Sequence, residues 1–271
     1  MATAILGGLL KQGISPDKIL VIDPALQQRT KLEQTYHITT RPQADNLLNQ
    51  ANTIIWAIKP QIFREAALAT KPFLAQSSPL HISVAAGIKS KHIATWLQSE
   101  RVVRVMPNTP ALIGKGITGM YAMSAVSEPQ RHQADKLLQT VGQTLWVQTE
   151  EQLDGITAVS GSGPAYAFYL IEAMEQAAQE LGFTAVQAKQ LAVSTVAGAA
   201  ALAAQSSETA ATLRERVTSK GGTTFAALSH MENNHIKQHL IQAIHKAAER
   251  SKELGDEFGN LTTGINPPIN P

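Results

Sequence analysis

The residues best arranged for chemistry lie in the second half of the chain, in the run Val217-Thr218-Ser219-Lys220-Gly221-Gly222-Thr223-Thr224. A pair of adjacent glycines lets several backbone N–H groups converge on one point, as in an anion-binding nest. A helix is predicted to begin near Thr223, and its free N–H groups and dipole favour the same anion. The hydroxyl groups of Ser219, Thr223 and Thr224 add donors. The run therefore predicts a neutral receptor for a carboxylate; a simple helix cap is the alternative, but a cap would not need the glycine pair.

Three further motifs in the first half each follow a short apolar run. They are Ala57-Ile58-Lys59-Pro60, Ser83-Val84-Ala85-Ala86-Gly87 and Met106-Pro107-Asn108-Thr109-Pro110. Ligands of open α/β sheets bind at the carboxyl ends of the strands, where these motifs are expected to lie. The structural alternatives are a proline that ends a strand, a tight glycine turn and a proline-fixed loop. The amide of Asn108 and the hydroxyl of Thr109 can both hydrogen-bond a ligand, which favours function for the third motif.

A fourth motif, Ser160-Gly161-Ser162-Gly163-Pro164, opens a long predicted helix. Glycines and hydroxyl groups at a helix N-terminus are compatible with an anion. A flexible hinge with Ser162 as the helix cap explains the same residues equally well.

Alternating strands and helices must position the motifs of the first half. Short runs rich in Val and Ile, apolar almost throughout, are typical of strands buried on both faces of a parallel sheet. The predicted strands are Ile19–Asp23, Ile54–Lys59, Ile82–Ala86, Val102–Met106, Thr118–Ala122 and Thr144–Val147. Helix-length segments separate them: Ala2–Gln12, Leu26–Tyr36, Ala44–Gln50, Gln61–Ala75, Ser90–Gln98 and Glu128–Val141. This alternation predicts βαβ units.

The strand pattern stops near Glu150, and only helices are predicted beyond it. They are Pro164–Leu181, Ala185–Ala204, Thr209–Val217, Thr223–Met231 and Ile236–Lys252. The second of these is dense in small residues, which allow close helix contact and suit a dimer core. We therefore expect a dinucleotide-binding domain over residues 1–149, a helical substrate and dimerisation domain over 150–254, and a mobile tail over 255–271.

The composition excludes several classes of binding partner and of catalytic chemistry. The 271 residues carry 23 basic and 21 acidic side chains, a net charge of +2, with no basic cluster. That argues against nucleic acid or an anionic membrane as a partner. The chain has no cysteine, which excludes disulfides and thiolate chemistry, and its eight histidines show no zinc-ligand spacing. We expect a cytoplasmic protein without a bound metal.

In their order and spacing, the five motifs resemble those of the pyrroline-5-carboxylate reductase family over residues 1–254. The resemblance implies a Rossmann-like domain followed by an all-α dimerisation domain. It implies reduction of 1-pyrroline-5-carboxylate to L-proline by hydride transfer from NADPH or NADH, by a homodimer that can assemble further into a decamer.

The resemblance also implies roles for individual residues. The cofactor contacts are Ala2, Ala57, Ile58, Lys59, Pro60, Ala86, Asn108 and Thr109. The substrate contacts are Glu150, Ser219, Gly222, Thr223 and Thr224, with Thr224 beside the ring nitrogen as the catalytic candidate. Lys220 replaces a proline usual in the family. The choice of cofactor stays open, because Asp23 would favour a free ribose hydroxyl whereas Arg29 could bind a 2′-phosphate.

The N-terminus departs from the family pattern, which has a strand and a Gly-x-Gly-Asn-Met-Ala loop before the first helix. Met1-Ala2 takes the place of the last two loop residues, so the first strand and both leading glycines are missing. We therefore expect unpaired edges on the strands Ile19–Asp23 and Ile54–Lys59, and weakened cofactor binding by this chain. Two other functions compete with the reductase: a related imine or β-hydroxyacid-type reductase, and an inactive homologue that acts only as an oligomerisation module.

Overall fold

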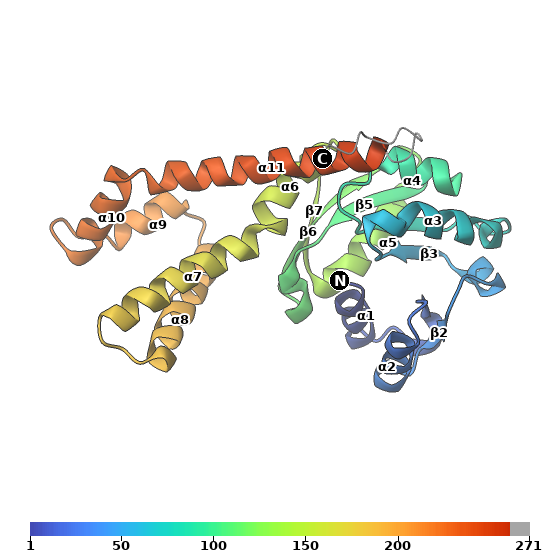
Figure 1. Cartoon of the computed structure of the whole chain (residues 1–271), viewed down its shortest axis with the longest axis horizontal. Helices are drawn as coiled ribbons and strands as arrows, with labels where there is room; N and C mark the ends of the chain where they lie inside the picture. Colours follow the sequence, from blue (N-terminus) through green and yellow to red (C-terminus); the bar gives the residue numbers. More distant parts are fainter. Residues whose placement is uncertain (261–271) are drawn as a thin grey trace, which may run out of the picture. The chain divides into compact units, whose positions relative to one another are not determined.

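A computed structural model describes residues 1–260, with side chains to residue 257. The chain forms two compact units. Unit 1 comprises Met1–Gly161 and the chain from Ala247 onward, and unit 2 comprises Ser162–Lys246. Figure 1 traces the elements of both units in chain order.

Over the described residues, unit 1 contains seven strands in two sheets. A five-stranded sheet has the order β3-β4-β5-β6-β7, and β1 and β2 form a separate parallel pair. Within the larger sheet only β5 and β6 are antiparallel. The strand bounds are β1 Leu20–Ile22, β2 Thr39–Arg41, β3 Thr53–Trp56, β4 Leu80–Ser83, β5 Val102–Met106, β6 Gly116–Ala122 and β7 Gly142–Trp146. The α/β class predicted for the first half is confirmed, and every predicted strand is present.

The gap between the two sheets falls between β1 and β3. Among residues 1–260, β1 pairs only with β2, and β3 pairs only with β4. Each strand therefore has one edge without a partner strand, as expected from the sequence for Ile19–Asp23 and Ile54–Lys59.

The helices of unit 1 connect and cover these strands. Their bounds are α1 Ala2–Lys11, α2 Leu26–Tyr36, α3 Pro60–Thr70, α4 Ser90–Leu97, α5 Glu128–Leu138 and α6 Gln152–Ile156. Helix α5 begins at a capping box in which Ser127 and Gln130 satisfy each other's backbone groups. The helix predicted at Ala44–Gln50 is instead a 3₁₀ turn, Asn46–Gln50, because the Asp45 side chain accepts from Leu47 N at 2.9 Å and starts a tight turn.

Further short turns connect the main elements. They are the 3₁₀ turns η1 Pro16–Lys18, η3 Lys71–Leu74, η4 Thr109–Ile113 and η5 Gln139–Val141, and a π-helical turn, η6 Thr157–Gly161. The π turn follows α6 directly and ends where unit 1 gives way to unit 2.

Two apolar clusters hold the large sheet between its helices. One joins α1 to β4, β5 and β6 through Ile5, Ile82 and Met120. The other lies under α3 and α4 and includes Phe63 and Trp96, whose ring centroids are 5.8 Å apart. The carboxyl ends of β3, β4 and β5 are thus fixed by packing on both faces of the sheet.

Unit 2 consists of helices alone. The bounds are α7 Gly163–Glu180, α8 Ala185–Gln205, α9 Ala210–Arg216, α10 Thr223–Asn233 and the first part of α11 Ile236–Asn260. Helices α7 and α8 run side by side (Figure 1). The all-α prediction for the second half is confirmed. None of the described helices is long and apolar enough to cross a membrane.

The two compact units divide the chain at positions other than the domain boundaries expected from the sequence, which stay predictions. The chain enters unit 2 at Ser162 rather than near residue 150, because α6 and the π turn pack with unit 1. Helix α11 continues through Asn260, so the segment 255–260 is helical and not part of a tail. The end of α11, from Ala247 onward, belongs to unit 1, where Ser251 Oγ donates to Asp154 Oδ1 at 2.7 Å. The rest of the expected tail, residues 261–271, lies outside the described residues.

Candidate active site

Three of the sequence motifs meet at one edge of the large sheet. Strands β3, β4 and β5 are parallel, and Trp56, Ser83 and Arg104 lie side by side in the register. The loops that follow these strands therefore leave the sheet at the same edge. The structure brings together Ala57–Pro60, Ala86 and Asn108–Thr109, as expected for the carboxyl ends of parallel strands.

The loop after β3 leads directly into α3. Lys59 is the N-cap residue and is exposed, and Pro60 occupies the first turn. No side chain caps this helix. Pro60 has no N–H group and Ile62 N donates to Lys59 O at 3.2 Å, so the N–H group of Gln61 is the one at this helix start left for an anion or a polar cofactor edge. Ala57 and Ile58 are partly buried on the way from the sheet.

The loop after β4 exposes a single small side chain. Ala86 is exposed while its neighbours Ala85 and Gly87 are buried. Gly87 has φ +79°, a left-handed conformation that glycine adopts without steric cost. The loop therefore presents Ala86 on an otherwise buried turn, where a planar ring could approach closely.

Asn108 follows β5 and is 9% exposed. Its Nδ2 donates to Ser160 O at 3.1 Å, and its Oδ1 accepts from Ile117 N at 3.0 Å. The side chain thus ties the loop to the π turn and to the start of β6. The neighbouring Thr109 is exposed.

Ala2 is the first residue of α1 and is exposed. The first turn of this helix packs in the same apolar cluster as Ala111. Ala111 belongs to the 3₁₀ turn η4, which begins at Thr109. No side chain caps α1, so its N-terminus offers free N–H groups near the strand-end loops.

Asp23 and Arg29 are the two residues expected to influence whether NADH or NADPH is bound. Asp23, after β1, accepts from Ala25 N at 2.8 Å. Arg29 donates through Nη1 to the carbonyl oxygens of Asp23, at 2.8 Å, and Pro24, at 3.0 Å. The carboxylate and the guanidinium therefore lie together at the end of β1, and the choice stays open.

Glu150 lies in unit 1 and is surrounded by donors. Its carboxylate accepts from Ser90 N at 2.6 Å, from Ser90 Oγ at 2.9 Å and from Arg104 Nη1 at 2.6 Å. Neither partner was predicted from the sequence. A signal existed for one of them, because Arg104 is the single charge inside the apolar strand Val102–Met106.

The carboxylate-receptor motif lies in unit 2, at the start of α10. Gly221 has φ +73°, and Gly222 N donates to Ser219 O at 3.0 Å, so a tight turn delivers the chain to the helix. Gly222 is the N-cap and provides no side-chain cap, which leaves the first N–H groups of α10 free for an anion. Ser219, Lys220 and Thr223 are exposed and Thr224 is half-buried.

The histidine at position 81 is structural. His81 is 1% exposed in β4, and its Nδ1 accepts from Trp56 Nε1 at 3.2 Å. Burial lowers the pKa of His81 to about 4, so the ring is neutral at physiological pH. Among residues 1–260, no group of three or more carboxylate or histidine side chains is placed to hold a metal ion.

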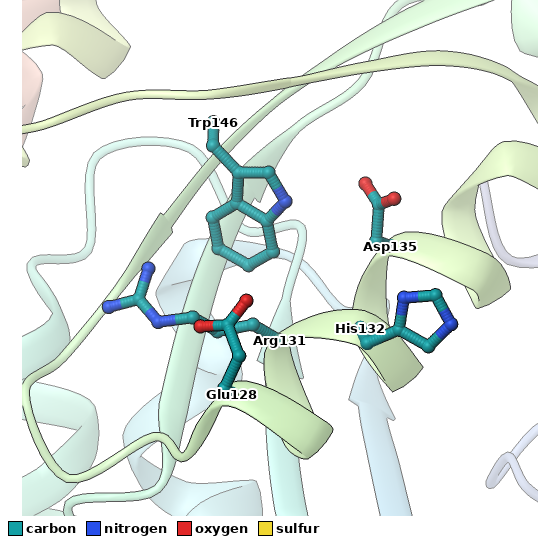
Figure 2. Close-up of a pocket in the computed structure, with 5 residues that line it drawn as sticks. All are labelled: Glu128, Arg131, His132, Asp135 and Trp146. Carbon is teal, nitrogen blue, oxygen red and sulfur yellow. The ribbon is translucent and has the colours of Figure 1, made fainter.

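A surface hollow of about 200 Å³ lies away from these loops, on α5 and β7. It is lined by Glu128, Arg131, His132, Asp135 and Trp146 (Figure 2). The Arg131 guanidinium lies 5.4 Å from the centre of the Trp146 ring, a cation–π contact that covers the indole. None of the residues predicted for the active site lines it.

A Rossmann-like sheet with loops at the carboxyl ends of β3, β4 and β5, followed by an all-helical unit, is the architecture of a two-part Rossmann-type oxidoreductase. The family model for pyrroline-5-carboxylate reductase dimerisation matches residues 150–254. A second model, NADP oxidoreductase coenzyme F420-dependent, matches residues 1–87.

Similar proteins agree over nearly the whole length. A pyrroline-5-carboxylate reductase of Pseudomonas aeruginosa is 40% identical over 260 residues, which is 96% of this chain and 95% of the relative. The solved reductase of Coxiella burnetii is 35% identical, with a TM-score of 0.87 over 93% of this chain and 94% of that one. A Plasmodium falciparum pyrroline carboxylate reductase solved with NADP bound is 25% identical, with a TM-score of 0.78 over 94% and 96%. The chain belongs to the pyrroline-5-carboxylate reductase family.

Proposed function

We propose that this protein reduces 1-pyrroline-5-carboxylate to L-proline with NADPH or NADH, in proline biosynthesis. The observation that carries this function is that a member of this family has two kinds of candidate site in one chain. One is a set of open loops at the carboxyl edge of β3–β5, and the other is an uncapped, glycine-led helix start at α10. A reductase of imines that lack a carboxylate has no use for the second site, and a pure oligomerisation module has no use for the first. A hydroxyacid also carries a carboxylate, so a hydroxyacid reductase is distinguished by its substrate.

The chemistry needs neither a metal nor a covalent nucleophile. A protonated cyclic imine is an electrophile, so a hydride can add to the imine carbon while the C=N π electrons move to nitrogen. The reduced nicotinamide supplies this hydride when bound. The protein then has to hold the two rings close together and aligned, and to bind the substrate carboxylate.

The carboxylate is assigned to the N-terminus of α10. Backbone N–H groups beginning at Thr223, with the hydroxyl groups of Ser219 and Thr223, form the receptor, and Gly222 keeps its approach open. Because these groups are neutral donors, Lys220 adds a positive charge beside them without displacing any. Thr224, half-buried on the first turn, is the proposed hydrogen-bond partner of the ring nitrogen.

The cofactor is assigned to the loops of unit 1. The free N–H groups of α3 and α1 suit its polar edges, with Lys59, Pro60 and Ala2 at these helix starts and Ala57 and Ile58 leading into α3. The exposed Ala86 offers a small side chain beside which a planar ring can lie. The hydroxyl of Thr109 is available for hydrogen bonding, and Asn108 holds its loop in place.

The active protein is proposed to be a homodimer joined through unit 2, able to assemble further into a decamer, and located in the cytoplasm. Large apolar side chains of this unit are exposed in the single chain, among them Phe168, Tyr169, Val186, Leu202 and Phe225. Within α8 only Ala188 and Ala192 are buried. A second copy of the chain would cover this surface.

A substrate panel tests the proposed function. Cofactor oxidation is measured with 1-pyrroline-5-carboxylate, with 1-pyrroline, which lacks the carboxylate, and with a β-hydroxyacid in the reverse direction. We expect turnover of the first compound and a catalytic efficiency at least tenfold lower for the second, because one charged hydrogen bond contributes about 1.5–3 kcal/mol. Preference for either of the other compounds would contradict the proposal.

A further inference from the structure

The carboxylate of Glu150 reaches across the sheet edge to a helix that begins 60 residues earlier in the sequence. It accepts two hydrogen bonds from Ser90, through the backbone N–H at 2.6 Å and through Oγ at 2.9 Å. A third donor, Arg104 Nη1, lies 2.6 Å away on β5. The Arg104 and Glu150 side chains are only 11% and 17% exposed, so this is a partly buried, fully engaged ion pair.

These contacts make Glu150 the cap of α4. Ser90 is the first residue of that helix, and the residue at the N-cap position, Lys89, provides no side-chain cap. A carboxylate on the first N–H groups satisfies an otherwise free donor and interacts favourably with the helix dipole. The start of α4 is therefore held by a residue from a distant part of the chain.

The segment just before α4 is the loop that presents Ala86. Only three residues separate Ala86 from Ser90, and Gly87 and Ile88 between them are buried. The same loop also meets the end of α11: a Cβ added to Gly255 would lie 3.4 Å from Gly87 O, and Lys89 Nζ pairs with Asp256 at 2.9 Å between partly exposed side chains. Among these contacts, the hydrogen bonds to Glu150 are the ones that involve a charged and largely buried side chain.

We propose that Glu150, held by Arg104, is a positioning residue: it fixes the start of α4 and thereby the Ala86 loop against which the nicotinamide is reduced or oxidised. This inference rests on the proposed function of that loop. It assigns Glu150 a role through Ser90 rather than through contact with the substrate, and it adds Arg104 and Ser90 to the residues on which hydride transfer depends.

The test compares Glu150→Gln with Glu151→Gln in the full-length protein. The control removes a charge from the adjacent residue, which is exposed and lies outside the proposed site. Amide hydrogen exchange of Ser90 and of residues 84–89 reports the loop without any need for activity. Steady-state kinetics and the primary isotope effect from cofactor deuterated at the transferred position report the chemistry.

For Glu150→Gln we expect faster exchange at Ser90 and in the loop. We also expect kcat to fall about tenfold to a hundredfold with KM for the imine nearly unchanged, as for a misplaced reactive group, and a larger isotope effect because hydride transfer becomes slower. Arg104→Lys, which keeps the positive charge beside Glu150, should retain more of kcat than Arg104→Met. Glu151→Gln should resemble the parent.

Three results would overturn the proposal: unchanged exchange at Ser90, faster exchange with unchanged kcat, or a raised KM for the imine with an unchanged loop. The last result would mean that Glu150 contacts the substrate directly. If Glu150→Gln does not fold, Ser90→Ala tests the same link, because it removes only the Oγ bond and should lower kcat in the same direction. If the parent chain has no reductase activity, the proposed function fails, but the exchange measurement still decides whether Glu150 fixes the loop.

Discussion

Arg104 on β5 donates to Glu150, which follows β7, with Nη1 and Oε1 2.6 Å apart and both side chains largely buried. The pair links the middle of the sheet to the start of α4, since the same carboxylate accepts from Ser90. Neither residue stands in a sequence motif of the strand ends. The pair nevertheless contacts chain segments next to the loops assigned to the cofactor, because Ser90 follows Ala86 by four residues and Arg104 precedes Asn108 by four.

Removing the arginine from this pair should destabilise the protein. Arg104→Met leaves a largely buried carboxylate without its cation, and loss of one partner of a buried pair costs on the order of 3 kcal/mol. The free energy of unfolding in urea measures this loss. The control is Arg41→Met, which breaks an exposed pair with Asp45 at 3.2 Å and should cost less than about 1 kcal/mol. Equal losses for the two variants would contradict the importance of burial.

Stability should also depend on the ionisation of His81. Its pKa is lowered by burial to about 4 in the folded protein, whereas an unfolded chain has a value near 6.5. The unfolded state therefore binds more protons between these values. Stability from this group is complete above about pH 6.5 and falls by about 3 kcal/mol as the pH drops toward 4.

Urea unfolding at several pH values measures this slope. His81→Leu removes the titrating ring, so its stability should vary less over the same range, although the lost bond from Trp56 lowers its stability at neutral pH. An unchanged pH slope in the variant would assign the effect to other groups.

The hydroxyl of Thr224 should matter for catalysis and little for folding. Thr224→Ala should lower kcat/KM for 1-pyrroline-5-carboxylate by about ten- to a hundredfold, because a hydrogen bond to a charged group contributes roughly 1.5–3 kcal/mol. Thr224→Ser keeps the hydroxyl and should retain most of the activity. Unchanged efficiency in the alanine variant, measured by steady-state kinetics, would exclude this role.

Assembly should depend on the small residues of α8. Ala199 is exposed in the single chain, so a larger side chain there meets no obstacle until a second copy packs against it. Ala199→Leu should weaken the dimer by about 1–3 kcal/mol, which sedimentation velocity detects as a shift toward monomer. Ala69→Leu, at an exposed position of α3 in unit 1, is the matched control. Identical assembly of both variants would place the interface elsewhere.

The sequence predicts the strands well because their burial leaves a clear pattern. Val102–Met106 is apolar apart from one arginine, and its observed bounds match the prediction. Strand β2 was missed because Thr39–Arg41 is short and polar, so neither length nor period marks it. Helix α6 and the π turn were missed because each has only five residues, too few for a helical period of apolar residues to be recognised.

The candidate site was predictable only in part. Motifs with prolines and glycines mark loops directly in the sequence, and the strand-end loops were located by them. The partners of Glu150 were not, because contacts over 46 and 60 residues leave no local pattern. The extension of α11 was missed for a similar reason: Gly255 looks like a helix end, yet it is buried beside the Gly87 loop.

Isotope labelling follows the transferred hydride and therefore tests the proposed reaction directly. The purified chain is supplied with 1-pyrroline-5-carboxylate and with NADPH or NADH carrying deuterium at the transferred position, and the product is analysed by mass spectrometry and NMR. We predict L-proline with one deuterium on the former imine carbon, formed in a one-to-one ratio with oxidised cofactor. Cofactor oxidation without labelled L-proline, or no turnover with either cofactor, would contradict the proposed reaction.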